Sequence, residues 1–250
     1  MIHVRNVSWK PGHNYILNNV SASIYPGDYV LVVGPNGSGK SSLLDIIAGS
    51  KTPHNGALYY NDRDITAVPE YERTAYIARL SQDPRNNTVD RLTVGENIAL
   101  ARSQGTFASL RNALRDKDAI ISMLTDFGFS EYIYNTVMHN LSGGQRQKIA
   151  FIMATCMQPD ILLLDEPTAA LDTRNATQLL SWVTWYQKTH NIAIVMVTHD
   201  PDAVAHLGNC IWWVRDGSVR RWTRHQLREA DIDVADIMGR IDYKAIQSAH

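Results

Sequence analysis

Apolar residues recur along this chain with two different spacings, and together the spacings predict an α/β protein. Short runs rich in valine, isoleucine and leucine, typical of strands, lie at residues 2–7, 20–24, 29–33, 56–60, 76–80, 161–164, 192–197, 211–214 and 218–222. Helical spacing follows the third run and dominates from about residue 93 to 158, where strand signals vanish. The pattern therefore predicts an α/β domain that carries a helical insertion.

Composition and charge narrow the class of protein. The chain of 250 residues has 24 Lys and Arg against 25 Asp and Glu, a balance that argues against a dedicated nucleic-acid binder. Cys156 and Cys210 lie far apart, so we expect free thiols in a reducing compartment. No apolar stretch approaches 18 residues and the N-terminus lacks a signal sequence. We expect a soluble cytoplasmic protein whose membrane role, if any, comes through a partner.

A glycine-rich loop between the third strand and the first helix fits the pattern G-x-x-x-x-G-K-[ST] at every fixed position. Its residues are Gly34, Pro35, Asn36, Gly37, Ser38, Gly39, Lys40, Ser41 and Ser42. Glycines let backbone N–H groups approach a phosphate closely, and the helix N-terminus favours the anion. The pattern therefore predicts that Lys40 reaches the β- and γ-phosphates of a nucleotide and that Ser41 places its hydroxyl on Mg²⁺.

Two adjacent carboxylates, Asp165 and Glu166, follow the apolar strand at residues 161–164. Ligands of open α/β sheets bind at the carboxyl ends of the strands. Asp165 suits coordination of Mg²⁺, and Glu166 suits positioning or deprotonating an attacking water. The alternative is a solvated acidic turn, which the upstream phosphate loop disfavours.

The stretch Leu141-Ser142-Gly143-Gly144-Gln145 opens the last helix of the insertion. Ser142 and Gln145 fit a capping box, so the stretch could be only a helix start. Two adjacent glycines weaken a helix, however, unless something must approach the backbone. A phosphate is the natural ligand of such a helix N-terminus.

Three further residues are candidates because of their positions. Trp9 ends the first strand, and its ring could either pack in the core or stack on a nucleotide base. Gln82 and His199 each follow a strand, at the edge where ligands bind. Taken alone, such a glutamine is usually solvated and such a histidine is usually structural.

In their order along the chain, these motifs resemble those of the ATP-binding-cassette (ABC) ATPases, over roughly residues 2–222. The pentapeptide and the phosphate loop together are far more specific than either alone. The resemblance implies a P-loop NTPase core, a mostly parallel sheet with helices on both faces, joined to an N-terminal antiparallel β subdomain and an inserted helical subdomain. It divides a single domain, 1–250, into a core with the β subdomain (1–92 and 159–222), a helical signature subdomain (93–158) and a tail (223–250).

The resemblance also implies site roles. Trp9 is the adenine-stacking aromatic, with Tyr15 as the alternative if the first strands are registered differently. Gln82 senses Mg²⁺ and contacts a permease. Asp172, in the pair Leu171-Asp172, crosses to a partner subunit, and His199 touches the γ-phosphate.

Members of this family work as head-to-tail dimers that hold ATP between the phosphate loop of one subunit and the signature residues of the other. The signature residues here are Ser142, Gly143, Gly144 and Gln145. The resemblance thus implies ATP and Mg²⁺ as cofactors and a homodimer, or a dimer with a related ABC ATPase. It also implies an integral membrane permease that holds the protein on the inner face of the cell membrane.

Details around Gln82 and residues 92–97 resemble an importer branch that pairs a solute-binding protein with a permease like those for branched-chain amino acids. We therefore expect a bacterial transporter subunit for a small, amino-acid-like solute. Two alternatives stay open: a soluble cassette ATPase, for example one in iron–sulfur assembly, and an exporter subunit.

Overall fold

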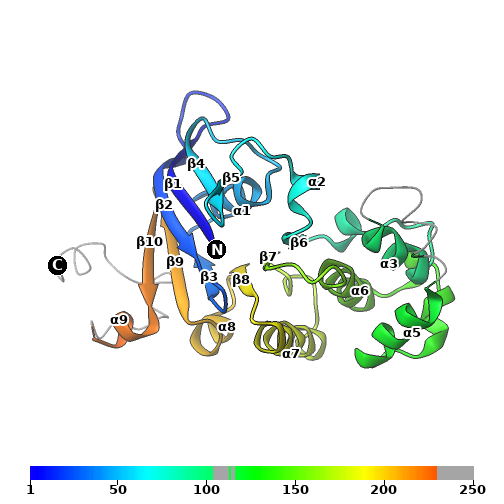
Figure 1. The fold of residues 1–250 in the computed structure, drawn as a ribbon. Helices are drawn as coiled ribbons and strands as arrows, with labels where there is room; N and C mark the ends of the chain where they lie inside the picture. The colour runs from blue at the N-terminus through cyan, green and yellow to red at the C-terminus, as the bar shows by residue number, and fades with distance from the viewer. Residues whose placement is uncertain (104–112, 114–115, 230–250) are drawn as a thin grey trace.

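The structure is a computed structural model that describes residues 1–103, 113 and 116–229 (Figure 1). Its main sheet has six strands in the order β10-β9-β3-β8-β7-β6. Strands β3, β6, β7, β8 and β9 pair in parallel, and β10 pairs antiparallel with β9. The bounds, in chain order from β3, are Tyr29–Val33, Ile77–Leu80, Ile161–Asp165, Ala193–Val197, Cys210–Arg215 and Ser218–Thr223.

A smaller antiparallel sheet contains the N-terminal strands in the order β2-β1-β4-β5. Its strands are β1 (Ile2–Trp9), β2 (Leu17–Ile24), β4 (Asn55–Tyr60) and β5 (Arg63–Asp64). The α/β class, the mostly parallel sheet and the N-terminal antiparallel sheet are therefore confirmed. The two-residue strand β5 was not predicted, because a pair of charged residues after a turn shows no apolar pattern.

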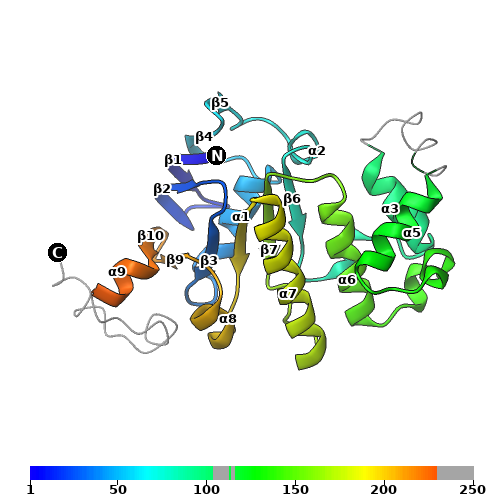
Figure 2. The same cartoon turned by 60° about the horizontal axis from the view of Figure 1, so that its bottom comes forward.

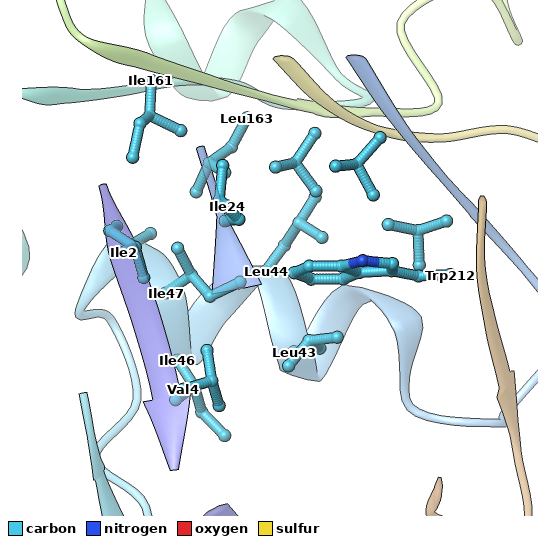
Figure 3. Packing of buried hydrophobic residues seen from close by; sticks show 14 of the residues in the cluster. Ile2, Val4, Ile24, Leu43, Leu44, Ile46, Ile47, Ile161, Leu163 and Trp212 are labelled. Atoms are coloured by element: carbon cyan, nitrogen blue, oxygen red, sulfur yellow. The ribbon is translucent and has the colours of Figure 1, made fainter. Parts of the chain in front are cut away.

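Helix α1 (Lys40–Ala48) lies between the two sheets (Figure 3). Its leucines and isoleucines contact apolar residues of both sheets, among them Ile2, Val4 and Ile24 from one and Ile161, Leu163 and Trp212 from the other. A helix that is apolar on most sides is stable only when buried, as this one is. The packing fixes the phosphate loop, which directly precedes α1, against both sheets.

The opposite face of the main sheet is covered by α7 (Thr173–His190), α8 (Pro201–His206) and α9 (Arg224–Glu229). Side chains of β3 alternate between the two faces: Val30 and Val32 join the cluster around α1, whereas Leu31 and Val33 join the cluster around α7. Helices on both faces are the arrangement that a parallel sheet requires.

Between β6 and β7 the described residues form helices. They are η1 (Pro84–Asn87), α3 (Val94–Arg102), α5 (Lys117–Asp126), η2 (Glu131–Asn135), η3 (Met138–Asn140) and α6 (Gly143–Thr155). α3, α5 and α6 share a separate apolar cluster (Figure 1). Within the helical segment expected over 93–158, residues 104–112 and 114–115 lie outside the described residues, as does the part of the expected tail beyond Glu229.

The described helices include none that is both long enough and apolar enough to cross a bilayer. Short α2 (Glu70–Arg73) completes the connection from β5 to β6.

Candidate nucleotide-binding and catalytic site

The phosphate loop leaves the carboxyl end of β3 and runs into α1. Gly34 has φ +150°, and a Cβ there would collide with the carbonyl oxygen of Val214 on β9. Gly39 has φ +103° and caps α1 without a side-chain hydrogen bond, so the first amides of the helix have no side-chain acceptor at the cap. Both glycines are therefore required by the local backbone, and the loop presents amides as an anion site does.

Lys40 is nearly buried, and its ammonium donates to the carbonyl oxygens of Gly34 and Pro35, each at 2.9 Å. Burial lowers the pKa of Lys40, while the carboxylates of Glu166 and Asp165 oppose that shift. The buried Ser38 hydroxyl has no partner among the described residues. Phosphate oxygens accept hydrogen bonds from groups such as these, the Lys40 ammonium and the unpaired Ser38 hydroxyl.

The two carboxylates after β7 face different partners, as expected for adjacent residues at a strand end. Asp165 is largely buried and accepts a hydrogen bond from the Ser41 hydroxyl at 3.3 Å. Glu166 has φ +46°, which is uncommon for a side chain other than glycine, and its Oε1 lies 3.2 Å from Nε2 of His199. The structure thus brings Lys40, Ser41, Asp165, Glu166 and His199 to one end of the sheet.

Arg79 is a site residue that sequence reasoning missed. Its guanidinium lies 2.7 Å from Asp45 on α1 and 3.5 Å from Asp165. Burial raises the pKa of Asp165, and the charge of Arg79 together with the Ser41 hydrogen bond opposes the shift. The available signal was an arginine on β6, the strand that ends just before Gln82.

Gln82 lines a cavity of about 700 Å³ together with Asp165. The same cavity is lined by Gly143 and Gln147 of α6, so it joins the carboxyl end of β7 to the signature helix. The position of Gln82 beside Asp165 agrees with a role near a bound metal or nucleotide.

The signature residues form the predicted capping box. Ser142 Oγ accepts from the backbone N–H of Gln145 at 3.2 Å, and the Gln145 side chain accepts from the N–H of Ser142 at 3.0 Å. Gly143, by contrast, has open space where a Cβ would lie. Packing within the subunit therefore does not explain why position 143 is a glycine. An external ligand that approaches the backbone closely would explain it.

The two aromatic candidates occupy different environments. Trp9 packs against the core around α1, and the ammonium of Lys51 lies 4.3 Å from its ring centroid. Tyr15 is 46% exposed and lines a cavity of about 270 Å³ together with phosphate-loop residues Pro35 and Ser38. These contacts favour Tyr15 over Trp9 as the base-stacking residue.

Asp172 caps α7, since its Oδ1 accepts from the N–H of Asn175 at 2.9 Å. Leu171, the residue before it, lines the cavity that contains Gln82 and Asp165. The pair Leu171-Asp172 therefore lies between the carboxyl end of β7 and the first turn of α7.

Comparison with known proteins identifies the family. Residues 17–169 match the sequence profile of the ABC transporter family. A tyrosine transport ATP-binding protein of Clostridioides difficile is 32% identical over 97% of this chain and 99% of its own length. A probable iron export ATP-binding protein, FetA, of Escherichia coli is 32% identical over 84% of this chain and 90% of its own length.

A solved structure with a similar fold is an ATP-binding cassette in a dimeric post-hydrolysis state bound to ADP and Pi. It is 29% identical, covers 89% of this chain and 98% of its own, and superposes with a TM-score of 0.72. Sequence motifs, fold and relatives agree, and this chain belongs to the ABC transporter family as an ATPase subunit.

Proposed function

We propose that the protein binds ATP with Mg²⁺, closes as a dimer around two nucleotides, and drives a small solute through a separate membrane permease. The observation that carries the proposal is the pairing of Glu166 with His199 beside the buried Lys40. A carboxylate, a histidine and a lysine at one sheet edge supply a base, a positioning group and a phosphate ligand.

The phosphate loop holds the nucleotide in this proposal. Lys40 exchanges its two carbonyl partners for β- and γ-phosphate oxygens, and Ser38 adds a hydroxyl donor. Ser142 and Gly143 of a second copy approach the γ-phosphate from the other side, where the N-terminus of α6 favours an anion. Water excluded between the two surfaces strengthens each of these contacts.

Oxygen donors around Asp165 fit Mg²⁺, which prefers oxygen ligands and retains several waters. Ser41 and Asp165 are already hydrogen-bonded to each other, and Gln82 shares their cavity. The ion, when bound, neutralises charge that develops on the phosphate oxygens.

Hydrolysis requires a base for the attacking water. Glu166 takes one proton as the water oxygen bonds to the γ-phosphorus, and the bond from that phosphorus to the β–γ bridging oxygen breaks, so ADP leaves with the electron pair. His199 holds the Glu166 carboxylate in place through the 3.2 Å contact. Lys40 stabilises negative charge on the departing groups.

Import of an amino-acid-like solute is the transport role we infer, with a solute-binding protein and a homodimer as partners at the cytoplasmic face of the membrane. The tyrosine transport relative supports an amino-acid-like solute. A thiamine import ATP-binding protein of Photobacterium profundum, 33% identical over 78% of this chain and 77% of its own length, supports import. The iron export relative makes an exporter subunit the second candidate.

Reconstitution tests the direction of transport. The chain and the permease that copurifies with it are placed in vesicles with ATP on the side of the ATPase. Import predicts ATP-dependent movement of amino acids toward that side, and Glu166→Gln abolishes the movement. Movement away from the ATPase side supports the exporter, and failure to retain any membrane protein supports a soluble ATPase.

A further inference from the structure

Lys148, on the second turn of α6, has a buried ammonium with neutral partners. It donates to Asn175 Oδ1 at 2.7 Å and to Gln178 Oε1 at 2.5 Å, and it lies 5.6 Å from the ring centroid of Trp182. Burial lowers the pKa of Lys148, and the charge of Asp172 opposes the shift. Because burying a charge away from a direct counter-ion is unfavourable, its partners must be well placed to hold it there.

Asn175 connects this ammonium to Asp172. Its side-chain N–H₂ donates to Asp172 Oδ2 at 2.5 Å, while its backbone N–H donates to Oδ1. A lysine can only donate and an ionised carboxylate can only accept, so the orientation of the amide between them is fixed. The chain of contacts runs in one direction, from Lys148 through Asn175 to Asp172.

The same asparagine contacts the start of the signature helix. A Cβ on Gly144 would lie 3.0 Å from Cγ and Nδ2 of Asn175, so only a glycine lets α6 approach α7 this closely without a shift. A second tie lies one residue before Lys148: buried Gln147 donates to the carbonyl oxygen of Pro167 at 3.0 Å. α6 and α7 run side by side (Figure 2) and are joined at the ends that carry the motifs.

We propose that Lys148 and Asn175 form a positioning relay that holds the signature helix start, Ser142–Gly144, at a fixed spacing from Asp172. The inference rests on the proposed dimer, in which both motifs of one subunit act on the nucleotide bound by the other. A rigid relay brings Ser142–Gly144 and Asp172 to the nucleotide of the second subunit together, so that nucleotide site is completed in one step. Misplacement of reacting groups by about 1 Å can lower a rate 100-fold, which gives the relay its importance for hydrolysis.

A double-mutant cycle on steady-state hydrolysis tests the relay. Lys148→Met and Asn175→Leu each lower kcat by about 10- to 100-fold, while nucleotide affinity of the isolated subunit, measured with a fluorescent ATP analogue at low protein concentration, changes less than about twofold. The double variant resembles either single variant, because both changes break one connection. Lys148→Arg, which keeps a charged donor, recovers most of kcat.

Lys188→Met is the control: it also replaces a lysine by methionine, but at an exposed position near the C-terminal end of α7, and we expect it to leave kcat unchanged. Additive losses in the double variant overturn the relay, as does a loss of kcat that Lys148→Arg fails to restore in a chain with unchanged thermal unfolding. Dimerisation is measured separately in the Glu166→Gln background. If the Glu166→Gln chain stays monomeric in ATP, the proposed dimer is contradicted. If that chain dimerises and adding Lys148→Met does not weaken the dimer, the relay is contradicted.

Discussion

His199 Nε2 lies 3.2 Å from Glu166 Oε1, and the two residues follow neighbouring parallel strands, β8 and β7. The contact depends on the left-handed backbone of Glu166, whose N–H donates to the carbonyl oxygen of Val197 on β8. The sheet register therefore brings the Glu166 carboxylate to the histidine, while the neighbouring Asp165 contacts Ser41.

Glu166→Gln should separate binding from hydrolysis. The amide keeps the size of the side chain but cannot take a proton, and general-base catalysis typically contributes about 10²–10⁴-fold. We expect phosphate release to fall by that order while ATP binding persists, because Lys40, Ser41 and Asp165 are unchanged. In ATP and Mg²⁺ the variant should run as a dimer by size exclusion with light scattering, and in ADP as a monomer.

Lys40→Ala is the control for that experiment, because its defect lies in nucleotide binding and it should not dimerise in ATP. Near-normal phosphate release by Glu166→Gln would remove Glu166 as the base and return attention to His199.

Adenine stacking distinguishes Tyr15 from Trp9. Base stacking on an aromatic ring contributes about 1–3 kcal/mol, so loss of the true platform should weaken ATP binding about 5- to 150-fold. Because Tyr15 lines the cavity beside the phosphate loop, we expect Tyr15→Ala to show this weaker ATP binding, measured by titration with a fluorescent ATP analogue. Trp9→Ala should mainly lower thermal stability, and the reverse pattern would restore Trp9, the first choice from the sequence.

The loop at residues 83–91 should form the contact that couples ATP hydrolysis to the permease. It follows Gln82, which shares a cavity with Asp165, and it is tied to α6 by the ion pair of Asp90 with Arg146. Single cysteines placed along 83–91 should crosslink to the permease in membranes. Cysteines along α9 are the comparison, and crosslinks confined to them would rule out this loop as the coupling surface.

Arg73 should be a major determinant of stability. It is 1% exposed and donates to carbonyl oxygens at the end of α1 and in the preceding loop, those of Ile46, Ile47, Ile65, Thr66 and Val68. Arg73→Met leaves several buried carbonyls without donors, and we expect the free energy of unfolding to fall by about 3 kcal/mol or more. Chemical denaturation measures the change, with exposed Arg63→Met as the control. A loss as small as that of the control would contradict the assignment.

Much of the fold could be predicted because local signals agree with it. Helix α3 lies at the start of the predicted helical segment, 93–158, where Thr93 and Glu96 form a capping box. Gly49 ends α1 with φ +94°, as a C-cap glycine does. The pairing order of the strands was not predictable from periodicity, since β3 pairs with β8 and β9 from the far end of the chain.

The site was predictable where motifs have fixed spacing, and less so where contacts come from distant segments. The phosphate loop and the carboxylate pair follow their strands as expected. The roles of Arg73 and Arg79 depend on carbonyls and carboxylates that lie elsewhere in the sequence, so a single arginine in a strand or short helix gave no sign of them. Tyr15 and Trp9 differ in burial, which two aromatic residues in adjacent segments do not reveal.

The pairing of β3 with β8 and β9 also sets when the protein can first bind nucleotide during its synthesis. The ribosome releases β3 long before either neighbour, yet β3 pairs with both of these late strands and Gly34 packs closely against Val214 of β9. Contacts this distant in sequence form late, after most of the chain is free. The native surroundings of the phosphate loop are therefore complete only after β9 has been synthesised, so we expect the nascent chain to bind nucleotide late in translation.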